Sequence, residues 1–187
     1  NRYPSLASYA AAKANAVGFQ TPDDIAVLNA DNPASWAMRR RTHAKVVSTS
    51  VRRSAGVRIV HGWIVASERI CPVNSLALGG THNLANALAA VAVAQAWGLR
   101  SSQIAAGLRT FSGLAYREQT IAKIAGVTYV NDTAATSPDA TIAALRRFGR
   151  RVVLIAGGAD KRFPQAEVRR LAQVIGQGTR SVVLLAG

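Results

Sequence analysis

The sequence predicts an α/β fold with a parallel sheet, and two observations carry the prediction. From Tyr129 onwards the chain alternates strand, helix, strand, helix, strand. Two of those strands, RVVLIAGG and SVVLLAG, are apolar along their length, which is typical of parallel strands that helices cover on both faces. Pro138 and Gly98 stand where one helix is expected to begin and another to end.

Helices and strands also alternate in the first part of the chain. Helical periodicity predicts a helix over residues 6–19. Asn32 and Pro33 predict the N-cap and first residue of another helix, which extends to residue 40. Short apolar runs predict strands, at residues 24–29, 45–50 and 57–66, with residues 74–78 as a further candidate.

A break at residues 112–114 divides the chain into two expected domains, residues 1–112 and residues 113–187. Two helices precede the break, over residues 81–98 and 101–111, with Thr81 near the start of the first and Gly98 as its stop. Beyond the break we expect two strands around a turn at Gly126, a helix from Pro138 to Phe148, a strand over 151–158, a helix over 165–176 and a strand over 181–187.

Composition bounds the class of protein. With 187 residues and 49% hydrophobic content the chain can bury a core, and no run of about 18 apolar residues predicts a membrane span. The start, NRYPSLASYAAAK, is polar and helix-like, unlike a signal peptide. The single cysteine, Cys71, fits a reducing compartment, so we expect a cytoplasmic protein. Because the chain begins with Asn and stops on a buried-type strand, we also expect both ends to continue in a longer protein.

The formal net charge of +14 would attract phosphate-rich partners such as nucleic acid, anionic lipid or nucleotides. The arginines stand in pairs and triplets spread along the chain, without interleaved aromatic residues or zinc-ligand spacing. A solvated, arginine-rich surface explains this pattern with fewer assumptions, and nucleic-acid binding stays as an alternative.

Polar residues follow the strand that ends near Asn131. Ligands of open α/β sheets bind outside the carboxyl ends of the strands, and Asp132 stands at such an end, where its carboxylate could bind ribose hydroxyls. The hydroxyls of Thr133 and Thr136 and the free N–H groups of the following helix could hold an anion. From these residues alone, a helix capped by Ser137 and without a ligand is the alternative.

A second loop has similar features. The strand VVLIA runs into Gly157 and Gly158, where a ligand could approach the backbone, and Lys161 then supplies a positive charge. A turn with a surface lysine is the alternative. Two such loops after successive parallel strands favour a ligand site.

Six stretches together resemble the Mur ligases of peptidoglycan synthesis in order and spacing. They are NRYPSLASYAAAK, DIAVLNADNP, HNLANALAAVAVA, FSGLAYREQ, GVTYVNDTAATSPDATIAAL and VVLIAGGADK. The resemblance covers nearly the whole chain, is weakest between Arg39 and Leu78, and is closest to the members that add D-glutamate. It implies the end of a central ATP-binding domain in residues 1–112. For residues 113–187 it implies the first part of a Rossmann-like, glutamate-binding domain.

The resemblance also implies an activity. Such a ligase joins D-glutamate to UDP-N-acetylmuramoyl-L-alanine: ATP phosphorylates the carboxylate, and the amino group of glutamate attacks the acyl phosphate. ATP and Mg²⁺ would be the cofactors. The phosphate-binding motif G-x-x-x-x-G-K-[ST] does not occur in this sequence, and the family keeps it upstream of the position of Asn1. We therefore expect this chain alone to be inactive.

Four residues would bind the nucleotide if the resemblance holds. It implies that Asn83 and Asn86 contact adenine, since an amide offers a donor and an acceptor to a base edge. Arg117 would contact the nucleotide phosphate, and Asp132 would bind ribose. Helix capping by Asn83 and a surface position for Arg117 are the alternatives.

Three residues would serve the amino acid and the metal. Thr136 and Lys161 would hold the carboxylate of glutamate. Lys13 and Lys161 are the implied catalytic residues, and Lys13 would bind Mg²⁺ if it is carbamylated, because a carbamate supplies the oxygen ligand that Mg²⁺ prefers. A helical lysine on the surface is the alternative for Lys13.

One departure from the family bears on specificity. The family commonly has Ser-Lys after the strand-end aspartate, whereas this sequence has Thr133 and Ala134. The missing lysine removes a positive charge near the glutamate site. A related ligase that adds L-glutamate or another amino acid therefore stays open as the alternative.

Overall fold

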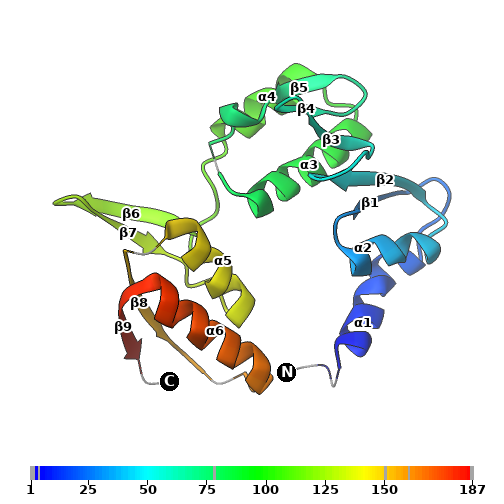
Figure 1. Cartoon of the computed structure of the whole chain (residues 1–187). Helices are drawn as coiled ribbons and strands as arrows, with labels where there is room; N and C mark the ends of the chain where they lie inside the picture. The colour runs from blue at the N-terminus through cyan, green and yellow to red at the C-terminus, as the bar shows by residue number, and fades with distance from the viewer. Residues whose placement is uncertain (1–2, 4, 78, 150, 160, 186–187) are drawn as a thin grey trace. The chain divides into compact units, whose positions relative to one another are not determined.

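The computed structural model describes residue 3 and residues 5–77, 79–149, 151–159 and 161–185 (Figure 1). The chain divides into two compact units between Ser112 and Gly113, and each is treated by itself. No helix in the described part of the chain is long and apolar enough to cross a membrane.

The unit Tyr3–Ser112 is built on a five-stranded sheet in the order β1-β2-β3-β4-β5. Its strands are β1 (Ile25–Asn29), β2 (Lys45–Ser50), β3 (Val57–Val60), β4 (Trp63–Val65) and β5 (Arg69–Pro72). The first three are parallel to one another, whereas β4 and β5 run antiparallel to their neighbours. The carboxyl ends of β1 and β2 therefore lie at one edge of the sheet.

Helices cover both faces of the parallel part of this sheet. The helices of this unit are α1 (Leu6–Gly18), α2 (Pro33–Ala37), α3 (Thr81–Ala96) and α4 (Ser101–Thr110), with short 3₁₀ turns η1 (Met38–Arg40) and η2 (Val73–Ser75). On one face Val27 packs against a cluster that includes the fully buried Leu88 and Val91 of α3. On the other face Leu28 packs with Val17 of α1.

The expected ends of two of these helices are confirmed. The side chain of Asn32 accepts a hydrogen bond from the N–H of Ser35 at 3.0 Å, which caps α2, and Pro33 is the first helical residue. The run expected as one helix over residues 32–40 changes to the 3₁₀ turn η1 at Met38. Gly98 has a φ of 78° and follows the last turn of α3.

Two expectations for this unit are wrong. Residues 57–66 form the hairpin of β3 and β4 instead of one strand, because His61 and Gly62 adopt φ of 47° and 77° and reverse the chain. The candidate strand at residues 74–78 is not formed: the helical turn η2 ends at Ser75, and Leu78 lies outside the described residues. The sequence also did not predict β5, since four residues give too short a pattern.

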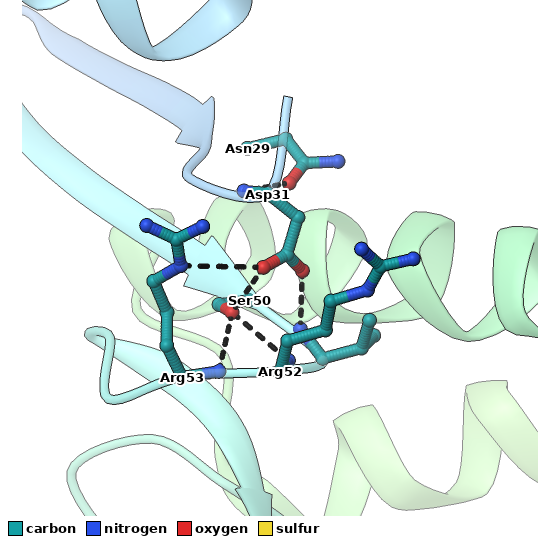
Figure 2. A network of polar contacts seen from close by, with 6 residues as sticks. Asn29, Asp31, Ser50, Arg52 and Arg53 are labelled. Atoms are coloured by element: carbon teal, nitrogen blue, oxygen red, sulfur yellow. Dashed lines mark hydrogen bonds and ion pairs between the residues drawn. The ribbon is translucent and has the colours of Figure 1, made fainter. Parts of the chain in front are cut away.

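A polar network joins the ends of β1 and β2 (Figure 2). Asp31, just after β1, accepts a hydrogen bond from the Ser50 hydroxyl on Oδ1 and one from the Val51 N–H on Oδ2, both at 2.7 Å. The Nε of Arg53 lies 3.7 Å from Oδ1, and the Asp31 side chain is only 11% exposed. The carboxylate thus links two parallel strands that have no direct turn between them.

The surroundings of Asp31 favour its charged form. Burial alone would raise the pKa of this carboxyl group, but the hydrogen bonds from Ser50 and Val51 and the charges of Arg53 and Arg52 outweigh burial and lower the pKa below its ordinary value of 3.8. The network is therefore an ionised one at neutral pH.

The unit that begins at Gly113 holds the remaining elements, which match the expected order. They are β6 (Gln119–Ile124), β7 (Val127–Asn131), α5 (Pro138–Phe148), β8 (Val152–Gly157), α6 (Gln165–Gly178) and β9 (Thr179–Leu185). The antiparallel hairpin of β6 and β7 turns at Ala125 and Gly126, as expected at Gly126. The strands β8 and β9 are parallel, and α5 packs beside α6 (Figure 1).

The sheet of this unit differs from the expectation in two respects. In the part of the chain that the structure describes, β7 pairs with β6 and not with β8, so there are two separate two-stranded ladders. One face of β8 is also open, with Val153 and Ile155 55% and 65% exposed. Helices thus cover both faces of the sheet at β1, whereas one face of β8 is left exposed.

Replacing Gly157 by alanine should loosen the ladder of β8 and β9. A Cβ at Gly157 would lie 2.6 Å from both the Cβ and the carbonyl oxygen of Leu185, so β9 would have to move. We expect the free energy of unfolding of this unit to fall by about 1–3 kcal/mol. Denaturant unfolding and faster amide exchange in both strands would report the loss.

The matched control is Gly176→Ala in α6, where an added Cβ meets nothing within 4 Å and alanine favours the helix. This control should be neutral or stabilising. Equal losses in the two variants would show that the close approach at Gly157 is not the cause.

Asp31→Asn should lower the free energy of unfolding of the unit Tyr3–Ser112 by about 1.5–3 kcal/mol at neutral pH, the range for hydrogen bonds to a charged group. Because the folded-state pKa is lowered, the stabilisation is present above the unfolded-state pKa and is lost as the pH falls through the folded-state pKa. The gap between wild type and variant should therefore shrink below about pH 4.

Urea unfolding at neutral and acidic pH measures this gap, with the exposed Asp23→Asn as control. A gap that stays constant over that pH range would contradict the role of the ionised carboxylate.

Candidate functional site

The residues that the sequence singled out fall in both units. The unit Tyr3–Ser112 contains Lys13, Asn83 and Asn86, and the unit from Gly113 contains Arg117, Asp132, Thr136 and Lys161.

Lys13 lies exposed on α1, one turn after Tyr9. Its Nζ is 5.5 Å from the centre of the Tyr9 ring, within the range of a cation–π contact. An ammonium group is not a metal ligand, so only a carbamylated Lys13 would fit Mg²⁺. Within the described ranges no group of three or more His, Cys, Asp or Glu side chains could hold a metal ion. Lys13 is the one residue that the sequence assigned to Mg²⁺, and it could bind the ion only as a carbamate.

Asn83 and Asn86 lie three residues apart near the start of α3, and so on neighbouring positions of one helix face. The Asn83 side chain donates a hydrogen bond to the carbonyl oxygen of Gly79 at 2.9 Å. It thus ties the preceding loop to the helix, and the N-cap of α3 is Gly80, not Asn83. Asn86 is exposed, and its amide is open to a ligand.

Arg117 lies exposed in the middle of a strained loop. Its neighbours Tyr116 and Glu118 have φ of 66° and 43°, a left-handed conformation that residues other than glycine rarely adopt. Asp132 accepts a hydrogen bond from the Glu118 N–H at 3.0 Å, and the Ala134 N–H donates to the Tyr116 carbonyl at 2.9 Å. The structure therefore brings the loop that carries Arg117 against Asp132.

The segment after Asp132 leads directly into α5. Asn131 accepts hydrogen bonds on Oδ1 from the N–H and the hydroxyl of Thr133, at 3.1 and 3.0 Å, which closes a turn at the end of β7. Ser137 caps α5 by accepting from the Ala140 N–H at 3.4 Å, as expected. Thr136 is exposed immediately before this cap. The capped helix is confirmed, and it leaves the Thr136 side chain accessible.

Lys161 is exposed in the loop between β8 and α6. The strand before it ends at Gly157, and Gly158 has a φ of 121°, which only glycine adopts readily. Asp160 lies outside the described residues. Lys161 thus follows the carboxyl end of β8, as Asp132 follows that of β7.

Several polar contacts were not predicted from the sequence, and two of them involve nearly enclosed carboxylates. One is the Asp31 network, for which the position of Asp31 after a strand was an available signal. The other is an ion pair between Glu118 and Arg147 of α5. These two residues are 29 positions apart, and no local pattern joins them.

Comparison with known proteins gives the family. The model of the Mur ligase middle domain matches residues 1–94, half of the chain. UDP-N-acetylmuramoylalanine–D-glutamate ligase of Pelotomaculum thermopropionicum is 40% identical over 99% of this chain and 42% of its own length. The enzyme of that name from Methylococcus capsulatus is 40% identical over 99% of the chain and 40% of its own length. The chain thus spans about two fifths of the length of these relatives.

Solved structures share the fold at low sequence identity. MurF from Acinetobacter baumannii matches with a TM-score of 0.79 and 19% identity, over 96% of this chain and 42% of its own. The complex of FPGS with AMPPCP and folate matches with a TM-score of 0.67 and 18% identity, over 96% of this chain and 46% of its own. The order of elements, the residue motifs and the match to the middle-domain model agree, and the chain belongs to the Mur ligase family.

Proposed function

We propose that this chain is part of an ATP-dependent ligase that joins D-glutamate to UDP-N-acetylmuramoyl-L-alanine in peptidoglycan synthesis. The observation that carries the proposal is the 40% identity over 99% of the chain to relatives that bear the name of this activity. The chain spans 40–42% of the length of these relatives, so we assign the activity to the complete protein and not to the 187 residues alone. A cytoplasmic location fits the nucleotide substrates and the buried free thiol of Cys71.

The reaction needs an activated carboxylate. A carboxylate is a poor electrophile, and transfer of a phosphoryl group from ATP gives it a leaving group that the amine of glutamate can displace. The protein must then neutralise phosphate charge and hold the amine in line. We assign residues 1–112 to the central ATP-binding domain and residues 113–187 to the glutamate-binding domain.

For the nucleotide we propose four contacts. The exposed amide of Asn86 and the amide of Asn83 would meet the adenine edge, where an amide can donate and accept. Asp132 would bind the ribose hydroxyls. Arg117 would contact a phosphate, and its exposure beside Asp132 supports this role.

For glutamate we propose Thr136 and Lys161. Lys161 would pair with the carboxylate of the amino acid, and the exposed Thr136 hydroxyl would donate to it. A carbamylated Lys13 would be one ligand of Mg²⁺, which neutralises phosphate charge when it is bound.

The second candidate is a ligase for L-glutamate. The observation that favours it is Thr133 and Ala134 in place of the Ser-Lys pair common in the family. The Thr133 hydroxyl donates to Asn131, and Ala134 brings no charge, so neither residue replaces the lysine. The names of the relatives favour D-glutamate.

Phosphate release by the complete protein distinguishes these candidates. With ATP and UDP-N-acetylmuramoyl-L-alanine present, we expect release that depends on D-glutamate. Release with L-glutamate alone would support the second candidate and make Thr133 and Ala134 specificity determinants. No release with either amino acid would contradict both.

Asp132→Ala and Lys161→Ala should each remove most of the activity of the complete protein. Loss of a charge-assisted hydrogen bond of about 1.5–3 kcal/mol corresponds to roughly a 10- to 100-fold fall in kcat/KM. Lys161→Ala should raise the KM for glutamate, and Asp132→Ala that for ATP. The exposed Lys123→Ala serves as control. Near-normal turnover in both variants, with folding intact by circular dichroism, would refute the site assignment.

A further inference from the structure

We propose that Glu118 and Arg147 form a positioning pair that holds Arg117 in its nucleotide-binding conformation. The inference rests on the proposed function, in which Arg117 contacts the nucleotide phosphate. Neither Glu118 nor Arg147 is assigned to the substrates or to ATP there. Their role would be to fix the backbone on which Arg117 stands.

The loop that carries Arg117 needs such support. Tyr116 and Glu118 both adopt positive φ, and this conformation persists only where surrounding contacts over-determine it. The backbone of the loop is held at two points, by the Ala134 N–H on the Tyr116 carbonyl and by Asp132 on the Glu118 N–H. The Tyr116 N–H also donates to the side chain of Gln119 at 3.0 Å.

The ion pair adds the link from a side chain of the loop to α5. Arg147 lies in the last turn of α5, and its guanidinium contacts the Glu118 carboxylate. The Glu118 side chain is 12% exposed and the Arg147 side chain 32%, so water screens this pair less than an open surface pair. The Arg147 guanidinium also lies 5.4 Å from the centre of the Phe148 ring, which limits its freedom. A rigid helix therefore holds the residue next to Arg117.

The same contacts couple Arg117 to Asp132. One carboxylate oxygen of Asp132 accepts a hydrogen bond from the Glu118 N–H. A shift of Glu118 therefore changes the surroundings of both Arg117 and Asp132. The pair should thus affect binding of ATP and leave binding of glutamate unchanged. A merely structural contact would have no such selectivity.

A double-mutant cycle on the complete enzyme tests the proposal. Glu118→Gln removes the charge at constant size and should raise the KM for ATP about tenfold, since small misplacements of binding groups have effects up to about a hundredfold. The KM for glutamate should not change. In the Arg117→Ala background, Glu118→Gln should have a much smaller effect on the KM for ATP, because the residue it positions is gone and only its contact with Asp132 remains.

Two further variants test the ion pair without relying on Glu118→Gln alone. Arg147→Gln should reproduce the effect of Glu118→Gln, and the exchange of charges in Glu118→Arg with Arg147→Glu should restore part of ATP binding. The neighbouring Arg146→Gln is the matched control, since Arg146 is exposed on the same turn of α5. Melting temperatures identify any variant that fails to fold.

The outcomes separate the pair from the proposed function. If Arg117→Ala weakens ATP binding while Glu118→Gln and Arg147→Gln do not, the positioning pair is refuted and the role of Arg117 stands. If Glu118→Gln has the same effect with and without Arg117, it acts by another route and the proposal also falls. If Arg117→Ala leaves ATP binding unchanged, the role of Arg117 in the proposed function fails, and the positioning role fails with it.

Discussion

The carboxylate of Asp31 is the constraint on which the parallel part of the sheet depends. A hairpin turn sets the register of two antiparallel strands, but β1 and β2 are parallel and are separated by α2 and η1. A slip by one residue would turn Val27 and Leu28 to the wrong faces, and both of those faces are buried. Asp31 opposes the slip because it is hydrogen-bonded to Ser50, the last residue of β2, and to Val51, the next residue of the chain.

The unit from Gly113 uses the same arrangement at Asp132. Strands β1 and β7 each end in an asparagine. Its side chain accepts a hydrogen bond from the N–H two residues later, at 2.8 Å for Asn29 and 3.1 Å for Asn131. An aspartate close behind then accepts a backbone N–H from a neighbouring segment. Asp31 is almost enclosed, with both oxygens hydrogen-bonded, and so it stabilises the sheet. Asp132 is half-buried next to the exposed Arg117, which leaves it near the solvent where a ligand can bind.

The elements that the sequence predicted well are those with local chemical signals. Helix α5 matches its expected bounds because Ser137 and Pro138 mark its start and Gly149 its end. The turn at His61 and Gly62 was missed, since apolar residues continue on both sides of it and outweighed the turn signal of Gly62. The contacts Asp31–Ser50 and Glu118–Arg147 join residues 19 and 29 positions apart, which no local pattern encodes. The ligand roles of Asn86 and Lys161 come from family resemblance, and they stay predictions.

Strained backbone lies next to two residues of the candidate site, Arg117 and Lys161. The described non-glycine residues with positive φ are His61, Tyr116, Glu118, Ala125 and Arg162. Two of them need no functional explanation, because His61 and Ala125 each precede a glycine in a hairpin turn. The other three flank Arg117 or follow Lys161 directly. A strained conformation costs about 1–3 kcal/mol, persists where surrounding contacts over-determine it, and is most frequent at functional sites. The strain that turns do not explain therefore lies beside the two cations assigned to phosphate and glutamate, where the position of a charge has the largest effect on binding.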